Sequence, residues 1–156
     1  MPVNVVLYQP EIPPNTGTIA RTCAATGTSL HLIKPLGFSI EDKHLKRAGL
    51  DYWYLLDLHI YENVEEFFEK NKGKRIYFGT TKAKSYYTDM NYEEDCFIMF
   101  GKETAGIPMD ILNKHMDTCI KIPMVKNEKA RSLNLSNSVN IVLYEVLRQI
   151  GFRDLI

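Results

Sequence analysis

Short apolar runs alternate with helix-sized segments along the chain, and this alternation constrains the fold more than any other feature. The strand-like runs cover residues 3–8, 30–33, 55–61, 75–78, 96–100 and 118–122. The helix-like segments begin near residue 15 or 16 and then cover 41–48, 64–71, 109–114 and 139–150. Strands that alternate with helices form a mostly parallel sheet, because each connecting helix packs back onto the sheet. The sequence therefore predicts an α/β fold with helices on both faces of the sheet.

The first and last helices have different inner faces. In the last helix, apolar residues recur every three or four positions and form one broad stripe, which Gly151 should terminate. This stripe consists of Val139, Val142, Leu143, Val146, Leu147 and Ile150. The first helix should be capped by Asn15 or Thr16 and should end at Gly27. Its inner face consists mostly of small residues, which permit close approach to a sheet. These residues are Ile19, Ala20, Cys23 and Ala24.

The overall composition limits the class of protein. The 156 residues suffice for one domain and hardly for two. Lys+Arg and Asp+Glu are both 19, so contacts with nucleic acid must come from local patches rather than from a net positive field. The chain has no apolar run of membrane-spanning length and no signal-peptide pattern at its start. Its cysteines are far apart and lack metal-ligand spacing, so we expect a cytoplasmic protein without a metal site.

Glycine, hydroxyl and amide residues follow three of the predicted strands, in segments 79–82, 101–108 and 123–137. Ligands of open α/β sheets bind at the carboxyl ends of the strands. The sequence therefore predicts a small-molecule site built from loops between Phe100 and Ser136, suited to an adenine or a ribose. A glycine after a strand can also serve only as a turn, and one of Ser132, Asn134 and Ser136 could cap the last helix.

Three segments resemble the motifs of the SPOUT class of RNA ribose 2′-O-methyltransferases. They are PEIPPNTGTIAR at 10–21, FGKETAGIP at 100–108, and IPM at 122–124 together with SLNLSN at 132–137. Residues 37–53 narrow the resemblance to the small single-domain branch that methylates the wobble cytidine or uridine of leucine tRNAs. The resemblance covers nearly the whole chain. It implies a single domain over 1–156, with a C-terminal trefoil knot and the cofactor site in about 75–156.

The resemblance also implies partners and site residues. The methyl donor would be S-adenosylmethionine, the product S-adenosylhomocysteine, the substrate the anticodon stem-loop of a tRNA, and the assembly a homodimer. The cofactor would be held by Gly79, Thr80, Gly101, Ile122, Ser132 and Leu133. Catalysis would centre on Arg21, supplied by the partner chain, with Asn15, Glu103, Ser132 and Asn134 around it. Because a guanidinium keeps its proton, we interpret Arg21 as a ligand of phosphate and of the reacting oxygen rather than as a base.

Two groups of basic residues are candidates for contacts with RNA. The first group comprises Lys43, His44, Lys46 and Arg47, and the second comprises Lys126, Lys129 and Arg131. The second group lies between predicted cofactor residues and is the stronger candidate, although either could be an ordinary solvated surface.

Three other functions are alternatives to methyl transfer at the wobble position. A dehydrogenase or kinase-like nucleotide-binding domain would need Gly-x-Gly-x-x-Gly after the first strand, where residues 10–15 stand instead. A non-catalytic RNA-binding or assembly module on the same fold stays open. So does a 2′-O-methyltransferase that acts on another position of tRNA or rRNA.

Overall fold

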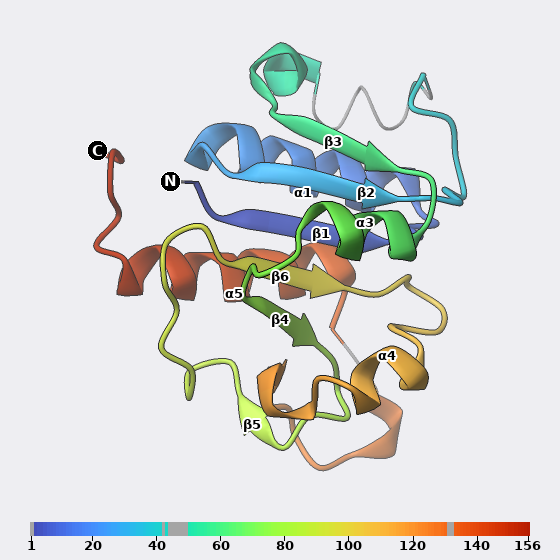
Figure 1. The fold of residues 1–156 in the computed structure, drawn as a ribbon, viewed down its shortest axis with the longest axis vertical. Helices are drawn as coiled ribbons and strands as arrows, with labels where there is room; N and C mark the ends of the chain where they lie inside the picture. Colours follow the sequence, from blue (N-terminus) through green and yellow to red (C-terminus); the bar gives the residue numbers. More distant parts are fainter. Residues whose placement is uncertain (1, 42, 44–49, 131–132) are drawn as a thin grey trace.

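The computed structural model describes residues 2–41, 43, 50–130 and 133–156, and these form a seven-stranded sheet with helices on both sides (Figure 1). The strands are β1 (Asn4–Tyr8), β2 (Ser29–Ile33), β3 (Leu58–Tyr61), β4 (Ile76–Gly79), β5 (Ser85–Tyr86), β6 (Phe97–Phe100) and β7 (Cys119–Lys121). Their order is β3-β2-β1-β6-β4-β7-β5, and every pairing between neighbours is parallel. The predicted parallel α/β sheet is confirmed.

Within the described residues, four α-helices cover the two faces of the sheet. They are α1 (Pro13–Thr26), α3 (Val64–Lys70), α4 (Met109–Asn113) and α5 (Leu135–Gln149). The described connections also contain the short 3-10 helices η1 (Leu50–Leu55), η2 (Met116–Thr118) and η3 (Glu128–Ala130). Helices α1 and α5 lie on one face and α3 and α4 on the other (Figure 1). Successive residues of β1 therefore enter different cores, Val5 with α1 and α5 and Val6 with α3 and α4.

Two predicted elements differ from the structure. Helix α1 begins at Pro13 with Ile12 as the N-cap, so the expected cap at Asn15 or Thr16 is wrong. Proline suits the first helical turn because its ring fixes φ there and no intrahelical donor is lost. The expected strand 55–61 is half right, since η1 occupies its beginning and β3 starts only at Leu58. The two-residue strand β5 was not predicted, because so short a strand leaves no periodic pattern.

Other predictions fall partly outside the described residues. Most of the charged helix predicted at 41–48 lies there, so its existence stays a prediction. The trefoil knot also stays a prediction. No helix within the described ranges is long and apolar enough to cross a bilayer.

A buried histidine joins β2 to its neighbours on the sheet. The ring of His31 is 4% exposed and stacks on His59 at 4.6 Å between ring centroids. Its Nε2 lies 3.0 Å from Asn4 Oδ1, and its Nδ1 lies 2.8 Å from the Tyr61 hydroxyl. Burial lowers the pKa of His31 from 6.5 to about 4. The folded protein therefore keeps this ring neutral at neutral pH.

The His31 site predicts a loss of stability in mild acid. Since the unfolded chain binds this proton more tightly, the stabilisation is present above pH 6.5 and falls as the pH drops toward 4. We expect the free energy of unfolding, measured in urea, to fall by about 2 kcal/mol between about pH 7 and about pH 5 through this group. His31→Gln, which cannot titrate, should lose that part of the pH dependence. An unchanged pH slope in the variant would contradict the assignment.

Candidate functional site

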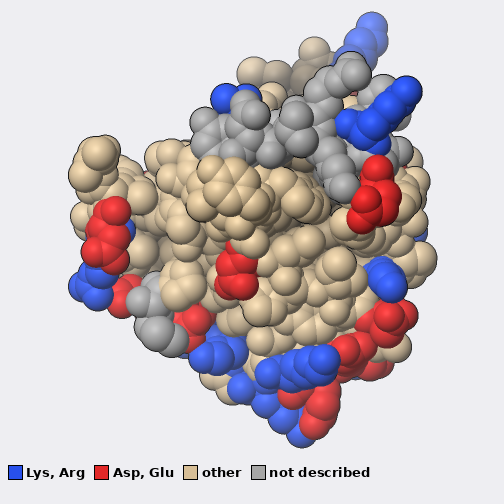
Figure 2. Space-filling model, turned by 90° about the horizontal axis from the view of Figure 1, so that it is seen from above, with Lys and Arg blue, Asp and Glu red and all other residues tan. Residues whose placement is uncertain are grey.

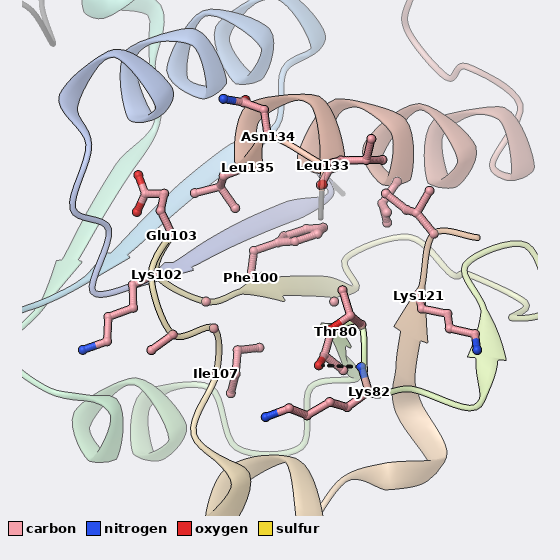
Figure 3. Close-up of a pocket in the computed structure, with 18 of the residues that line it drawn as sticks. Thr80, Lys82, Phe100, Lys102, Glu103, Ile107, Lys121, Leu133, Asn134 and Leu135 are labelled. Carbon is pink, nitrogen blue, oxygen red and sulfur yellow. Dashed lines mark hydrogen bonds between the residues drawn. The ribbon is translucent and has the colours of Figure 1, made fainter. Parts of the chain in front are cut away.

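A cavity of about 500 Å³ opens at the carboxyl ends of β4, β6 and β7, below the start of α5 (Figure 3). The lining comes from the segments that follow these strands and from the segment that enters α5. Among the predicted cofactor residues, five line the cavity: Gly79, Thr80, Gly101, Ile122 and Leu133. Ser132 lies outside the described residues. The loops predicted to form a small-molecule site therefore surround one cavity.

Two glycines allow backbone and rings to pack closely at the floor of the cavity. A Cβ on Gly101 would stand 2.1 Å from the carbonyl carbon of Gly106 and 2.2 Å from the nitrogen of Ile107. The turn is closed by the Gly106 N–H, which donates to the Lys102 carbonyl at 2.8 Å. A Cβ on Gly79 would stand 2.5 Å from the Phe100 ring. Side chains are excluded at both positions, so bare backbone borders the cavity there.

Several lining residues were not named individually as site residues, although most of them lie within the predicted range 100–136. The apolar ones are Phe100, Ile107, Leu135 and Val142. Figure 3 shows the Phe100 ring pointing into the cavity from β6. In the sequence this residue looked like any other buried strand residue, because apolar cores and apolar pockets have the same pattern. Lys82, Lys102 and Lys121 also line the cavity. In Figure 3 the side chains of Lys102 and Lys121 extend outward from it, and that of Lys82 runs along its lower side.

Glu103 connects the loop after β6 to the start of α1. Its carboxylate accepts hydrogen bonds from the backbone N–H groups of Glu11 and Ile12, both at 2.9 Å, and from Asn15 Nδ2 at 3.3 Å. Ile12 has no side-chain acceptor for the free N–H groups of α1, and the first turn of that helix has no acidic residue. Glu103 supplies both the acceptor and the negative charge from a distant part of the chain.

A reciprocal contact strengthens the same junction. Glu11 Oε1 accepts from the Thr104 hydroxyl at 2.7 Å and from the Thr104 N–H at 3.1 Å. These hydrogen bonds lower the pKa of Glu11 below its ordinary value. The segment before α1 and the loop after β6 therefore hold each other through two carboxylates.

Asn134 joins the start of α5 to the same junction. Its Oδ1 accepts from the N–H of Ser136 at 2.9 Å, so Asn134 is the residue that caps α5. Its Nδ2 donates to Asn15 Oδ1 at 3.1 Å. Three of the predicted catalytic residues, Asn15, Glu103 and Asn134, therefore form one hydrogen-bonded chain at the upper rim of the cavity.

Arg21 lies apart from these three residues. It is exposed on α1 and does not belong to the lining that the described residues form. Of the predicted RNA-binding residues, Lys43, Lys126 and Lys129 are exposed, while Arg47 and Arg131 fall outside the described ranges. Within one chain, the structure thus brings together the five described cofactor residues and the rim, but not Arg21.

Comparison with known proteins agrees with this architecture. The chain is 48% identical over 150 residues to the tRNA (cytidine(34)-2′-O)-methyltransferase of Methylovorus glucosotrophus, which covers 96% of each protein. A solved structure described as "Structural insights into the 2-OH methylation of C/U34 on tRNA" superposes with a TM-score of 0.91 at 40% identity, covering 97% of each chain.

A more distant structure shares the fold. The SpoU methyltransferase AviRb from Streptomyces viridochromogenes in complex with the cofactor AdoMet has a TM-score of 0.80 at 24% identity, covering 94% of this chain and 60% of that one. The resemblance inferred from the three motifs is confirmed by a match to the SpoU rRNA Methylase family over residues 2–144. That match includes both α1 and the cavity, and the chain therefore belongs to the SpoU rRNA Methylase family.

Proposed function

We propose that this chain transfers a methyl group from S-adenosylmethionine to the ribose 2′-hydroxyl of the wobble cytidine or uridine of leucine tRNAs. The observation that carries the proposal is the glycine-floored cavity at the carboxyl ends of β4, β6 and β7. It occurs in a chain that is 48% identical to a tRNA (cytidine(34)-2′-O)-methyltransferase over nearly its full length.

The residues present fit S-adenosylmethionine. A cavity of about 500 Å³ lies within the ordinary size range of small-molecule sites. Ile122 and Leu133 offer apolar side chains for an adenine, and the bare backbone at Gly79 and Gly101 leaves space and hydrogen-bonding groups for its edge and the ribose. When bound, this cofactor supplies a methyl group already activated by its sulfonium, so the protein mainly has to align the two reactants.

A homodimer would complete the site. Helices α1 and α5 pack side by side, and their outer face carries Ile141 and Tyr144, which are 37% and 48% exposed. Arg21 is exposed on α1. A second copy that covers this face would bury the apolar residues and bring its own Arg21 toward the first copy's cavity. This arrangement explains why Arg21 lies apart from the cavity of its own chain.

Arg21 would then grip the phosphate next to the reacting ribose and stabilise negative charge that develops on the 2′-oxygen. The carboxylate of Glu103 is occupied by the start of α1, so its role is to position that helix. Asn15 and Asn134 hold the two helix starts together. Ser132 would help to orient the reactants, as the resemblance to the family implies.

The decisive experiment is methyl transfer from labelled S-adenosylmethionine to bulk tRNA, with the modified nucleoside identified. We expect 2′-O-methylcytidine or 2′-O-methyluridine at the wobble position of leucine tRNAs. A methylated nucleotide at another position would show that the substrate is not the wobble nucleotide of leucine tRNAs. Cofactor and tRNA binding without methylation would favour the non-catalytic RNA-binding module.

The affinity for tRNA should depend strongly on salt. Because the chain has a net charge of +0, binding must come from local lysine–phosphate contacts that release counterions. We expect the affinity to fall roughly tenfold or more between about 50 and about 200 mM salt. An affinity that does not change with salt would rule out a nucleic-acid partner.

A further inference from the structure

The basic residues of this protein fall into two kinds. Several of those with described surroundings lie beside a carboxylate, as in Lys34–Glu62 at 3.2 Å, Lys70–Glu66 at 2.8 Å and Lys74–Asp95 at 2.6 Å. Figure 2 shows the β3 edge of the molecule, where side chains of both signs lie next to each other. Four lysines near the opposite edge differ: Lys82, Lys84, Lys121 and Lys126. Within the described ranges, no carboxylate lies within ion-pair distance of them.

These four lysines come from two segments without any acidic residue, 79–88 and 118–127. The segments lie side by side because β5 pairs with β7, with Ser85 opposite Ile120 and Tyr86 opposite Lys121. The Tyr87 N–H extends the pairing by donating to the Lys121 carbonyl at 2.8 Å. In a chain of zero net charge, these two segments therefore concentrate positive charge, and the nearest acidic residues along the chain are Asp89, Asp117 and Glu128 at their ends. Such a surface attracts a polyanion.

The edge is continuous with the cavity. Lys82 and Lys121 line the cavity as well as belonging to the basic segments (Figure 3). Strand β5 forms the outer edge of the sheet, seen at the bottom of Figure 1. An anion bound along β5 and β7 would thus lie beside the place where a cofactor and a ribose would meet.

Tyr86 adds an aromatic surface to this edge. Its side chain is 46% exposed, and Lys121 Nζ lies 5.6 Å from the centre of its ring. Its backbone is fixed by the pairing with β7, by its N–H donating to Asp89 Oδ2 at 2.7 Å, and by the Asp89 N–H donating to its carbonyl at 2.9 Å. A single exposed tyrosine is common on proteins. An exposed ring fixed among unpaired lysines is the combination that binds single-stranded nucleic acid, because every base can stack on it.

We propose that the β5–β7 edge is a binding site for single-stranded RNA. Tyr86 stacks on a base that neighbours the methylated nucleotide, and Lys82, Lys84, Lys121 and Lys126 contact the adjoining phosphates. The partner is a single-stranded loop rather than a duplex, since only unstacked bases can reach an aromatic side chain. This inference rests on the proposed function in taking RNA as the substrate, but it adds a site distinct from the cofactor residues and from Arg21.

The test compares Tyr86→Ala with Tyr86→Phe and with Tyr54→Ala. Tyr54 is 82% exposed on η1, near the opposite edge of the sheet, and serves as the matched control. The probe is an RNA stem-loop with the sequence of a leucine tRNA anticodon arm. Loss of one stacked base should weaken binding and raise KM about 5- to 100-fold in Tyr86→Ala. Tyr86→Phe and Tyr54→Ala should keep the wild-type values. All three should keep the wild-type melting temperature and affinity for S-adenosylmethionine.

The lysines are tested through salt. Lys84→Ala should reduce the slope of log affinity against log salt by about 0.7, the value for one phosphate contact on a single strand. Lys72→Ala is the control, because Lys72 lies 3.3 Å from Glu69 and is already paired. An unchanged slope in Lys84→Ala would show that Lys84 contacts no phosphate and does not belong to the site.

Failure of this inference can be told apart from failure of the proposed function. If the wild-type protein methylates tRNA and Tyr86→Ala binds and methylates the stem-loop as the wild type does, the β5–β7 edge is not the RNA site and the proposed function stands. If the wild type methylates no tRNA but binds the stem-loop through Tyr86, the proposed function is wrong and the RNA site stands.

Discussion

Replacing Arg21 with lysine is expected to lower the rate of methyl transfer to tRNA by about 100-fold or more, the size found when one preorganised donor to a reacting oxygen is removed. Lysine keeps the positive charge but loses the planar fork of donors that can hold a phosphate and the 2′-oxygen together. Because Arg21 does not line the cavity of its own chain, the affinity for S-adenosylmethionine should stay within about twofold.

The control is Arg75→Lys, which makes the same exchange at the amino end of β4, away from the cavity. It should keep wild-type kinetics. Near-normal turnover in Arg21→Lys would show that the guanidinium geometry is not needed and that a charge suffices.

Mixing variants tests whether Arg21 acts across the dimer. An Arg21→Lys chain retains a complete cavity, while a Gly101→Ala chain retains Arg21. If the arginine serves the partner's cavity, a mixed dimer of these two inactive chains contains one complete site and regains activity. If Arg21 acts within its own chain, the mixture stays inactive.

The sequence predicted the elements whose pattern is local. The apolar stripe of α5 and the run that became β1 were correctly identified, because periodicity along the chain determines which residues a helix or strand buries. Gly27 was correctly identified as the end of α1, since its φ of 67° favours glycine. These features depend on neighbours within a few residues.

Predictions failed where the determining partner is distant in sequence. Asn15 looked like the cap of α1, but the acceptor comes from Glu103, 91 residues after Ile12. Since Ile12 cannot cap a helix with its own side chain, no local signal marks it as the first cap residue. The resemblance named Glu103 as a site residue, yet only the structure revealed that its carboxylate is bound to the start of a helix.

Part of the candidate site could be predicted from positions after strands and from the motif match. Gly79 and Gly101 were identified from their place after strands and from the motif, and both line the cavity. Phe100 and Lys121 lie within the predicted range 100–136 but were not named as site residues, because a buried aromatic residue and a strand-end lysine have many ordinary explanations. The β5–β7 edge was also missed, since the pairing of Tyr86 with Lys121 joins residues far apart in sequence.

Gly101→Ala is expected to abolish most methyl transfer by deforming the floor of the cavity. The added Cβ would stand 2.1 Å from the carbonyl carbon of Gly106 and 2.2 Å from the nitrogen of Ile107, and both are backbone atoms that no rotamer change can move aside. The turn from Gly101 to Ile107 must therefore shift. A misplacement of about 1 Å in an active site costs roughly 100-fold in rate, and overpacking costs about 1–3 kcal/mol of stability.

Calorimetric titration with S-adenosylmethionine and urea unfolding would measure the two effects of Gly101→Ala separately. Gly73→Ala is the control, because Gly73 has a φ of 80° and open space around it, far from the cavity. That variant should lose about 1 kcal/mol through backbone strain while binding the cofactor normally. Gly101→Ala could instead lose only stability and bind the cofactor with wild-type affinity. That result would show that the turn from Gly101 to Ile107 can move without deforming the floor of the cavity. The cavity would then be shaped by the apolar side chains around Phe100 rather than by the contact between two stretches of bare backbone.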